Sequence, residues 1–209
     1  MITPDFSEER ARWTKGFHFI AGIDEAGRGP LAGPVVAAAV ILPVEFQSDW
    51  LHLVADSKVL TATRRELLYD RLYKEAVSVG VGVINVTTID MVGIAKATRL
   101  AMKMAVKQLE PAPEYLLVDY FRLPEVRLPQ KGVPDGDSIC VSIASASIVA
   151  KVTRDRLMVE YDKKYPGYRF ADHKGYGTRG HLECLKLLGA CPIHRRSFQP
   201  VMDVCSGAQ

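Results

Sequence analysis

One apolar run constrains the fold of this chain more than any other feature of its sequence. Residues 35–42, Val-Val-Ala-Ala-Ala-Val-Ile-Leu, are rich in β-branched side chains and alanine and contain no polar residue. Such a run is typical of a strand buried inside a sheet, and it is far too short to span a bilayer. The chain is therefore expected to build its core around a buried strand.

Apolar periodicity, interrupted by glycine and proline, divides the rest of the chain into strands and helices. Further strands are predicted over residues 17–24, 77–86 and 115–119. Helices are predicted from Thr61 or Thr63 to Ala76, from Thr88 or Asp90 to Glu110, over residues 142–161, and from Thr178 to Leu188. Because only the short link 29–33 separates the first two strands, they are expected to form a hairpin. This order predicts an α/β fold, a mixed β-sheet flanked by helices.

Charge is unevenly distributed along the chain. Residues 163–196 carry a net charge of +6, whereas the whole chain carries +3, so the remainder is negative. This division suits a protein that grips a polyanion with one part and holds cations with another, although a solvated basic face explains it equally well. We expect the sheet domain to occupy residues 1–162 and a small basic helical segment packed on it to occupy residues 163–209.

Two features bear on the cellular compartment. Residues 1–15 are charged and lack the apolar stretch of a secretory signal, so a cytoplasmic protein with no membrane association is expected. The four cysteines form no Cys-x-x-Cys pair, and free buried thiols are therefore expected. A zinc site is an alternative for four residues within one short stretch, although their spacing matches no usual finger or ribbon: His181, Cys184, Cys191 and His194.

Acidic residues stand near the ends of predicted elements. Asp24 and Glu25 close the first strand, Asp119 closes the fourth, and Asp137 precedes the long helix. Each has an ordinary explanation as a solvated turn, a loop-facing side chain or a helix cap. Together, four carboxylates suit Mg²⁺ or Mn²⁺, which prefer hard oxygen ligands. Two such ions about 3.5–4 Å apart can activate water and steady the leaving oxygen in phosphodiester hydrolysis.

A glycine-rich segment follows the first pair of carboxylates. Gly27 and Gly29 allow backbone conformations that other residues resist, and they let a phosphate backbone approach closely. Arg28 between them can fork onto a phosphate or, alternatively, form a plain salt bridge to Asp24 or Glu25.

Several segments, taken in order, resemble the ribonuclease HII family. They are GIDEAGRGPLAGPVV at residues 22–36, Asp56-Ser57-Lys58 with Leu60, Leu117-Val118-Asp119, Gly136-Asp137, ASIVAKV at 146–152 with Arg154-Asp155, HKGYGT at 173–178 and PIHRRSF at 192–198. The resemblance covers roughly residues 18–198. It implies a ribonuclease H-like catalytic domain over residues 1–162 with the helical segment behind it.

The resemblance also implies an activity. It indicates an endonuclease that cuts the RNA strand of RNA–DNA hybrids and incises 5′ of ribonucleotides embedded in duplex DNA, leaving 3′-hydroxyl and 5′-phosphate ends. Four carboxylates would hold two Mg²⁺ or Mn²⁺ ions: Asp24, Glu25, Asp119 and Asp137. The tail 202–209 contains no obvious clamp-binding peptide, which leaves protein partners open, and a monomer is expected.

Substrate-binding residues are implied in the same way. Gly27, Arg28 and Gly29 would hold the nucleic-acid backbone around the ribonucleotide, and Lys58 would contact a phosphate. Tyr176 would pack on the sugar and help to sense the 2′-hydroxyl that distinguishes RNA from DNA. The alternative for Tyr176 is a buried core position, which its glycine neighbours at 175 and 177 argue against.

Two positions depart from the family pattern. Tyr120 follows Asp119 where glycine is usual, and Asp135-Gly136 stands where Lys-Gly is usual. An added carboxylate beside the site is expected to weaken substrate binding or to alter the metal preference. Since neither change removes a ligand, activity is expected to survive.

Two other classes of protein compete with this interpretation. A resolvase or transposase core of the same superfamily has a similar carboxylate cluster but lacks the pairing of Gly-Arg-Gly with Tyr176. A nucleic-acid-binding protein that has lost catalysis is the other rival, and the four intact carboxylates argue against it.

Asp155 is a further carboxylate in the matched segments. If the long helix begins near Ser142, Asp155 lies roughly 20 Å from its start at about 1.5 Å rise per residue, whereas Asp137 lies just before that start. The two could share a metal only if the chain folds back before Ser142. We therefore predict a structural role for Asp155, pairing with a nearby arginine or lysine or capping a backbone segment.

Overall fold

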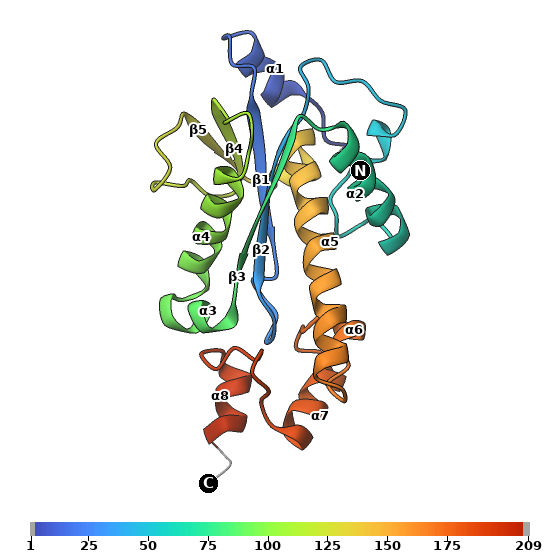
Figure 1. Cartoon of the computed structure of the whole chain (residues 1–209), viewed down its shortest axis with the longest axis vertical. Coiled ribbons are helices and arrows are strands. Elements are labelled where there is room, and N and C mark those ends of the chain that lie inside the picture. The colour runs from blue at the N-terminus through green and yellow to red at the C-terminus, as the bar shows by residue number, and fades with distance from the viewer. Residues whose placement is uncertain (1–2, 207–209) are drawn as a thin grey trace.

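Figure 1 shows the computed structural model, which describes residues 3–206, as a five-stranded sheet with helices on both faces. The strands are β1 (Ile20–Ala26), β2 (Val35–Ile41), β3 (Ser78–Ile84), β4 (Tyr115–Asp119) and β5 (Gln130–Val133). The α-helices are α1 (Ser7–Trp13), α2 (Ala62–Glu75), α3 (Val86–Val92), α4 (Ile94–Lys107), α5 (Val141–Lys164), α6 (Phe170–His173), α7 (Arg179–Leu188) and α8 (Gln199–Ser206). Short 3₁₀ helices cover Leu51–Leu53 (η1) and Gly136–Ser138 (η2).

The sheet is mixed, as predicted. Its strand order is β3-β2-β1-β4-β5, with β1, β2 and β3 antiparallel and β4 parallel to both β1 and β5. The predicted hairpin of β1 and β2 is confirmed, and residues 27–34 connect its strands. Because β1 and β4 are parallel neighbours, their carboxyl ends meet at one edge of the sheet.

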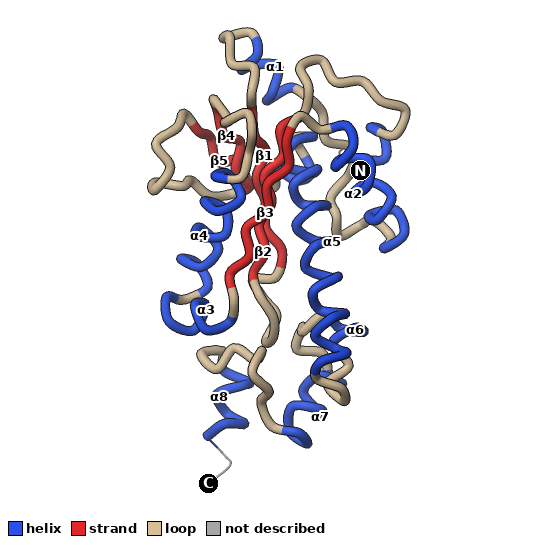
Figure 2. The backbone as a smooth tube through the Cα atoms, viewed as in Figure 1, coloured by secondary structure: helices blue, strands red, loops and turns tan. Residues whose placement is uncertain are grey.

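Helices cover the two faces of the sheet at close range. Figure 2 shows α3 and α4 on one side of the strands, with α5 and α2 on the other. Small residues allow this proximity: a Cβ added at Gly22 would lie 2.1 Å from a backbone atom of Ser142 in α5. A Cβ at Gly82 would lie 2.0 Å from the carbonyl oxygen of Ala101 in α4. The strand β2 lies between β1 and β3 inside this layered core, and every one of its residues is buried.

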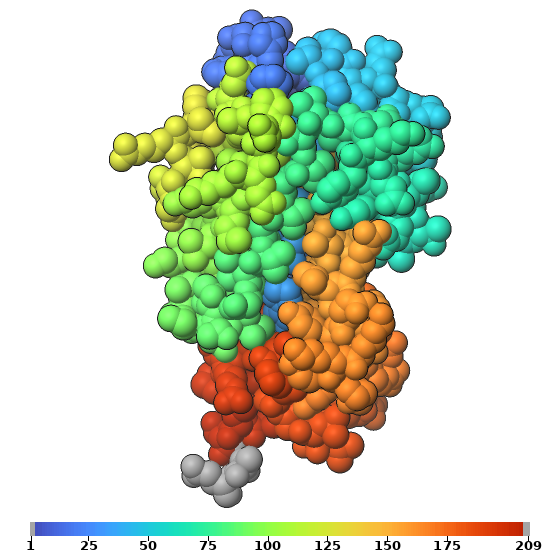
Figure 3. Space-filling model, viewed as in Figure 1, coloured from blue at the N-terminus to red at the C-terminus, as the bar shows by residue number. Residues whose placement is uncertain are grey.

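The C-terminal helices close one end of the molecule. In the space-filling view the C-terminal residues drawn in red lie next to α3 and the C-terminal half of α5 (Figure 3). The carboxylate of Asp90 in α3 accepts hydrogen bonds from the backbone N–H groups of Arg196 and Ser197 and from the Ser197 hydroxyl. The backbone N–H of Arg195 donates to the carbonyl of Leu31. This end of the chain is thus bound to the segment that follows β1.

Several local predictions need correction. The single helix from Thr88 or Asp90 to Glu110 is wrong, because Gly93 at φ +78° separates α3 from α4 and Asn85 caps α3. The first strand begins at Ile20 and continues through Asp24 and Glu25, so both carboxylates lie in the strand. The caps at Thr61 and Thr178 are confirmed. Among the described residues, six elements were not predicted: α1, η1, β5, η2, α6 and α8.

Candidate active site

Three of the four predicted carboxylates converge at the shared edge of β1 and β4. The register pairs Ile23 of β1 with Val118 of β4. The next residues, Asp24 and Asp119, are therefore neighbours on adjacent parallel strands. One oxygen from each of Asp24, Glu25 and Asp119 can be chosen so that all lie within 4.8 Å of one another. In the part of the chain that the structure describes, this is the only group of three or more acidic, histidine or cysteine residues with such spacing.

The carboxylates of this cluster destabilise one another's charge. Burial raises the pKa of Asp24 well above its usual value, and the nearby charges of Glu25 and Asp119 raise it further. Burial likewise raises the pKa of Glu25, although Arg28 opposes the shift. The Oε2 atom of Glu25 is buried without a hydrogen-bond partner among the described residues. A cluster of crowded carboxylates with an unpartnered oxygen fits a divalent cation, which would relieve the repulsion.

Asp137 lies beside this cluster, but its carboxylate is paired with a lysine. It is 5% exposed in η2, and its Oδ2 accepts a hydrogen bond of 3.0 Å from the Lys58 ammonium. The neighbouring backbone N–H of Gly136 donates to Asp119 at 2.8 Å. Burial of Asp119 raises its pKa, the Gly136 bond opposes this, and the charge of Asp137 adds to it. The structure therefore places Asp137 next to the three clustered carboxylates and pairs it with a lysine.

The predicted substrate-binding residues border the same cavity as the clustered carboxylates. This cavity has a volume of about 230 Å³, and its lining includes all five of them: Gly27, Arg28, Gly29, Lys58 and Tyr176. The Arg28 guanidinium lies 3.4 Å from Glu25 and over the Phe121 ring, with 41% of its side chain exposed. Sequence reasoning assigned no role to three further lining residues: Ser57, Ser147 and Lys151. All three belong to segments that resemble the family, and this resemblance could have marked them as residues of the site.

Tyr176 is a surface residue of this cavity. Its side chain is 44% exposed, which excludes the alternative of a buried core tyrosine. The Lys151 ammonium lies 5.9 Å from the centre of its ring and the Arg154 guanidinium 5.8 Å from it. An exposed aromatic face flanked by cations is suited to packing on a sugar with phosphates nearby.

Two buried arginines hold the glycine-rich loop from behind, and sequence reasoning missed both. Arg154 and Arg195 have no measurable exposure. Arg195 donates to the carbonyl oxygens of Gly27, Arg28, Gly33 and Pro34. Arg154 donates to the carbonyls of residues 32, 34 and 174, so it joins this loop to the segment of Tyr176. A Cβ at Gly27, which has φ +95°, would lie 2.0 Å from the Arg154 side chain.

Both guanidiniums are charges without an acidic partner. No carboxylate lies within 4.0 Å of either one among the described residues. Burial lowers the pKa of Arg195 to about 9, with a contribution from the charge of Arg154, and burial lowers that of Arg154 to about 10. Both groups remain protonated at neutral pH. Backbone carbonyl oxygens are therefore the hydrogen-bond acceptors for two positive charges beneath the loop, and aromatic rings add to them: Tyr176 near Arg154 and Phe198 near Arg195.

Comparison with known proteins identifies the family. A family profile described as Ribonuclease HII matches residues 21–201. A ribonuclease HII from Dehalococcoides mccartyi is 58% identical over 203 residues, which are 97% of this chain and 96% of that protein. The chain belongs to the ribonuclease HII family. It is an enzyme, a ribonuclease H.

Solved structures share the fold of this chain. The ribonuclease H2 of Pyrococcus horikoshii superposes with a TM-score of 0.74 at 25% identity, over 90% of this chain and 97% of that one. Bst-RNase HIII in complex with Mn²⁺ has a TM-score of 0.65 at 20% identity, over 92% of this chain and 70% of that one. The predicted ribonuclease H-like sheet is therefore confirmed. Within residues 3–206, no helix has the length and hydrophobicity needed to cross a membrane.

Both departures from the ribonuclease HII pattern lie at left-handed backbone positions. Tyr120 has φ +57° and Asp135 has φ +51°. Left-handed geometry explains why glycine suits position 120, where the chain turns sharply after Asp119 and the Tyr120 side chain is 69% exposed. The charge of Asp135 also contributes to the raised pKa of Asp119, after burial and the larger effect of Asp137.

Tyr120→Gly is expected to raise the free energy of unfolding by about 1 kcal/mol. The left-handed conformation costs an ordinary residue roughly 1–2 kcal/mol, and glycine's greater freedom in the unfolded chain offsets part of the gain. Urea denaturation measures the change. Asp135→Gly is the matched control and should gain less, because aspartate tolerates this conformation better than tyrosine does. A lower urea midpoint for Tyr120→Gly would contradict the prediction.

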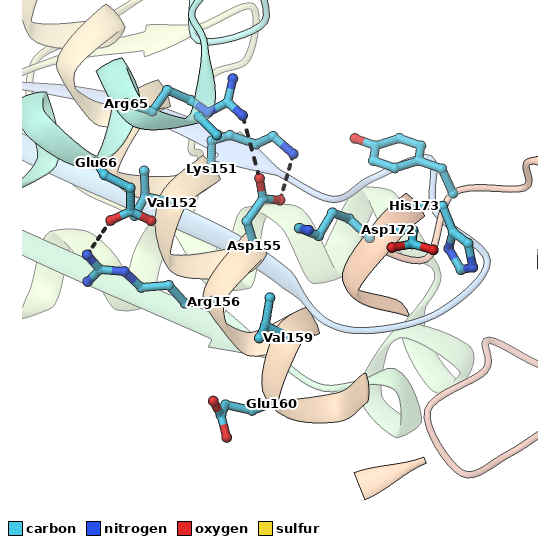
Figure 4. Close-up of a pocket in the computed structure, with 13 residues that line it drawn as sticks. Arg65, Glu66, Lys151, Val152, Asp155, Arg156, Val159, Glu160, Asp172 and His173 are labelled. Atoms are coloured by element: carbon cyan, nitrogen blue, oxygen red, sulfur yellow. Dashed lines mark hydrogen bonds and ion pairs between the residues drawn. The ribbon is translucent and has the colours of Figure 1, made fainter. Parts of the chain in front are cut away.

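A groove of about 550 Å³ adjoins the active-site cavity and shares Lys151 and Tyr176 with it. Its walls carry ion pairs (Figure 4). Asp155 accepts a hydrogen bond of 2.6 Å from Lys151 and lies 3.9 Å from Arg65, and Arg156 pairs with Glu66. The predicted pairing of Asp155 with a lysine or arginine is confirmed.

Asp155→Asn is expected to lower the melting temperature and to leave the dependence of the cleavage rate on divalent metal unchanged. The loss should be about 1–2 kcal/mol, between the values for exposed and buried ion pairs, because Asp155 is 17% exposed. Differential scanning fluorimetry and a Mg²⁺ titration of the cleavage rate measure the two quantities. A normal melting temperature together with a shifted metal requirement would refute the structural role.

Proposed function

We propose that this enzyme hydrolyses the RNA strand of RNA–DNA hybrids and cuts on the 5′ side of ribonucleotides embedded in duplex DNA. The products would carry 3′-hydroxyl and 5′-phosphate ends. One observation carries the proposal: the clustered carboxylates share a single cavity with the Gly-Arg-Gly loop and with the exposed ring of Tyr176. A cutting site and a site suited to sensing a sugar are thus adjacent.

Two divalent ions, Mg²⁺ or Mn²⁺, are the cofactors that we propose. Asp24, Glu25 and Asp119 would hold them, and Asp137 would join once its carboxylate leaves Lys58. When bound, the ions supply an activated water and neutralise charge on the leaving oxygen. The raised pKa values of the three clustered carboxylates support this assignment, because each group gains from a nearby cation.

The protein's own residues would orient the substrate. The hydrogen bonds of the described residues include none from the backbone N–H groups of Arg28 and Gly29, while the carbonyls of this loop accept from Arg195. These N–H groups are available to a phosphate or a 2′-hydroxyl. Lys58, whose side chain is 76% exposed, would contact a neighbouring phosphate. Tyr176 would pack on the sugar at the RNA–DNA junction.

The wider setting follows from the same proposal. Residues 163–209 would act as a basic helical segment packed on the catalytic domain 1–162, although residues 207–209 lie outside the described part. The enzyme would work as a cytoplasmic monomer in the removal of ribonucleotides from DNA and in replication. The tail 202–209, which ends outside the described residues, is not proposed as a clamp-binding peptide.

A duplex with one ribonucleotide tests the function. With Mg²⁺ or Mn²⁺ we expect a single cut on the 5′ side of the ribonucleotide, with a 3′-hydroxyl that a polymerase can extend. Tyr176→Ala should reduce this cleavage, whereas Tyr73→Ala, which removes a similarly exposed ring from α2, should not. Cleavage only at runs of several ribonucleotides would show that Tyr176 does not sense the sugar. Binding without cleavage would favour a protein that has lost catalysis.

A further inference from the structure

A buried pair of histidines lies behind Tyr176. His181, in α7, is 0% exposed, and His194, in the loop before α8, is 2% exposed. Their Nε2 atoms lie 3.0 Å apart, and the ring of Phe170 packs against both. These are two of the residues that the sequence offered as zinc ligands, but here they are hydrogen-bonded to each other.

The contacts of His194 determine which nitrogen carries its proton. The backbone N–H of Cys191 donates to His194 Nδ1 at 3.0 Å, and a backbone N–H can only donate. The Cys191 thiol lies 3.1 Å from the same nitrogen and, beside that N–H, would act as a second donor to it. Nδ1 of His194 must therefore be an unprotonated acceptor, so the proton of the neutral ring lies on Nε2. That proton points to His181 Nε2, which must accept it.

The same reasoning gives the hydrogen bond between His181 and the backbone of Tyr176. With Nε2 as acceptor, the neutral His181 ring carries its proton on Nδ1 and donates to the carbonyl oxygen of Tyr176 at 2.9 Å. The chain of donors runs from the Cys191 backbone through His194 and His181 to the Tyr176 backbone. It is complete in only one tautomeric state, in which both rings are neutral. Burial lowers the pKa of His181, and burial together with His181 lowers the pKa of His194 to about 4, which favours that state near neutral pH.

The segment that receives this bond needs support. Lys174 has φ +51° and Gly175 has φ +83°, so the chain before Tyr176 turns through two left-handed residues. A third histidine, His173, stacks on the His181 ring at 4.3 Å and accepts a hydrogen bond from the Gly175 backbone N–H. The backbone of Tyr176 is thus held by side chains on its inner side while its ring faces the cavity.

We propose that His181 and His194 are positioning residues for substrate recognition, since their hydrogen-bond relay fixes the backbone of Tyr176 and thereby the ring that meets the sugar. The proposal rests on the proposed function of Tyr176. It assigns these histidines a role in the specificity of the enzyme beyond packing of the C-terminal segment.

A first experiment tests the hydrogen-bond relay by NMR and does not depend on enzyme activity. Nitrogen chemical shifts of the imidazole rings in the full chain at pH 7 should show a neutral His181 protonated on Nδ1 and a neutral His194 protonated on Nε2. A cationic ring, or His181 protonated on Nε2, would overturn the relay.

A second experiment is a double-mutant cycle on the duplex with one ribonucleotide. His181→Phe should lower kcat/KM about tenfold, the effect of roughly one lost hydrogen bond, and should add less than about twofold when Tyr176→Ala is already present. His181→Asn, whose amide can still donate to the Tyr176 carbonyl, should restore much of the loss. Phe170→Leu is the matched control: it perturbs the same buried cluster and should lower the melting temperature without lowering kcat/KM.

The outcomes separate this proposal from the proposed function. Equal losses from His181→Phe with and without Tyr176 would show a general structural effect and overturn the positioning role. If Tyr176→Ala lowers kcat/KM but His181→Phe does not, the relay fails while the proposed function stands. If Tyr176→Ala has no effect, the role of Tyr176 fails and the positioning role fails with it.

Discussion

Asp24→Asn is expected to abolish turnover, with a loss of at least about a thousandfold in kcat, while the fold stays intact. Metal ions supply several kcal/mol of transition-state stabilisation, and about 4 kcal/mol corresponds to a thousandfold in rate. Asp24 is the most buried of the clustered carboxylates and lies close to both Glu25 and Asp119, so its loss should affect every ion held there. A cleavage assay with Mg²⁺ and with Mn²⁺ measures the effect.

The same variant should be more stable than the native protein when metal is removed. The pKa of Asp24 is raised in the folded protein, so its contribution to stability is present below the unfolded pKa and is lost as pH rises through the folded pKa. Near neutral pH the charged group therefore opposes folding, and asparagine removes that charge. Melting in EDTA should shift upward, and the rise in melting temperature on adding Mg²⁺ should shrink.

Asp70→Asn on the exposed face of α2 is the matched control and should change neither the rate nor the response to Mg²⁺. A near-normal rate for Asp24→Asn would reject the assignment of the carboxylate cluster as the metal site.

Arg195→Met is expected to lower the free energy of unfolding by about 3 kcal/mol. Hydrogen bonds from a charged donor contribute roughly 1.5–3 kcal/mol each, and relief of the buried charge offsets part of their loss. For a chain of this size the melting temperature should fall by about 6–12 °C. The variant should also raise KM for the duplex more than it lowers kcat, because the Gly-Arg-Gly loop loses its support while the carboxylates are untouched.

The neighbouring Arg196→Met supplies the control, since its side chain is exposed while its backbone makes the contact to Asp90. Arg195→Lys separates charge from geometry: it keeps the positive charge but cannot donate to four carbonyls from one planar group. We expect it to be nearly as unstable as Arg195→Met. An unchanged free energy of unfolding in Arg195→Met would show that the hydrogen bonds to the carbonyls contribute little to stability.

Much of the sheet could be predicted from sequence, because its inner strands are dense in apolar residues. The strand 115–119 is found where it was predicted, and β2 differs from its prediction by one residue. β5 was missed because Gln130–Val133 has a single large apolar residue and exists through its pairing with β4. The break at Gly93 was missed because one glycine inside an apolar helical pattern is compatible with a continuous helix.

The site was only partly predictable for a related reason. Resemblance to a family picked out four carboxylates, Asp24, Glu25, Asp119 and Asp137. No local pattern shows that Asp137 pairs with Lys58, 79 residues away. The buried arginines were harder still, because a charged residue is assigned to the surface unless a partner is known. Their partners are backbone carbonyls, which any sequence has.

The supports of the Gly-Arg-Gly loop bear on how the enzyme matures during synthesis. The carboxylates of β1 and β4 have all been synthesised once residue 119 has been made, yet Arg195 bonds to carbonyls 161 to 168 residues earlier in the chain to hold the loop. A nascent chain thus contains the three clustered carboxylates well before it contains the arginine that holds the loop. Competence to recognise a substrate is acquired last, when the ribosome has delivered the final helices.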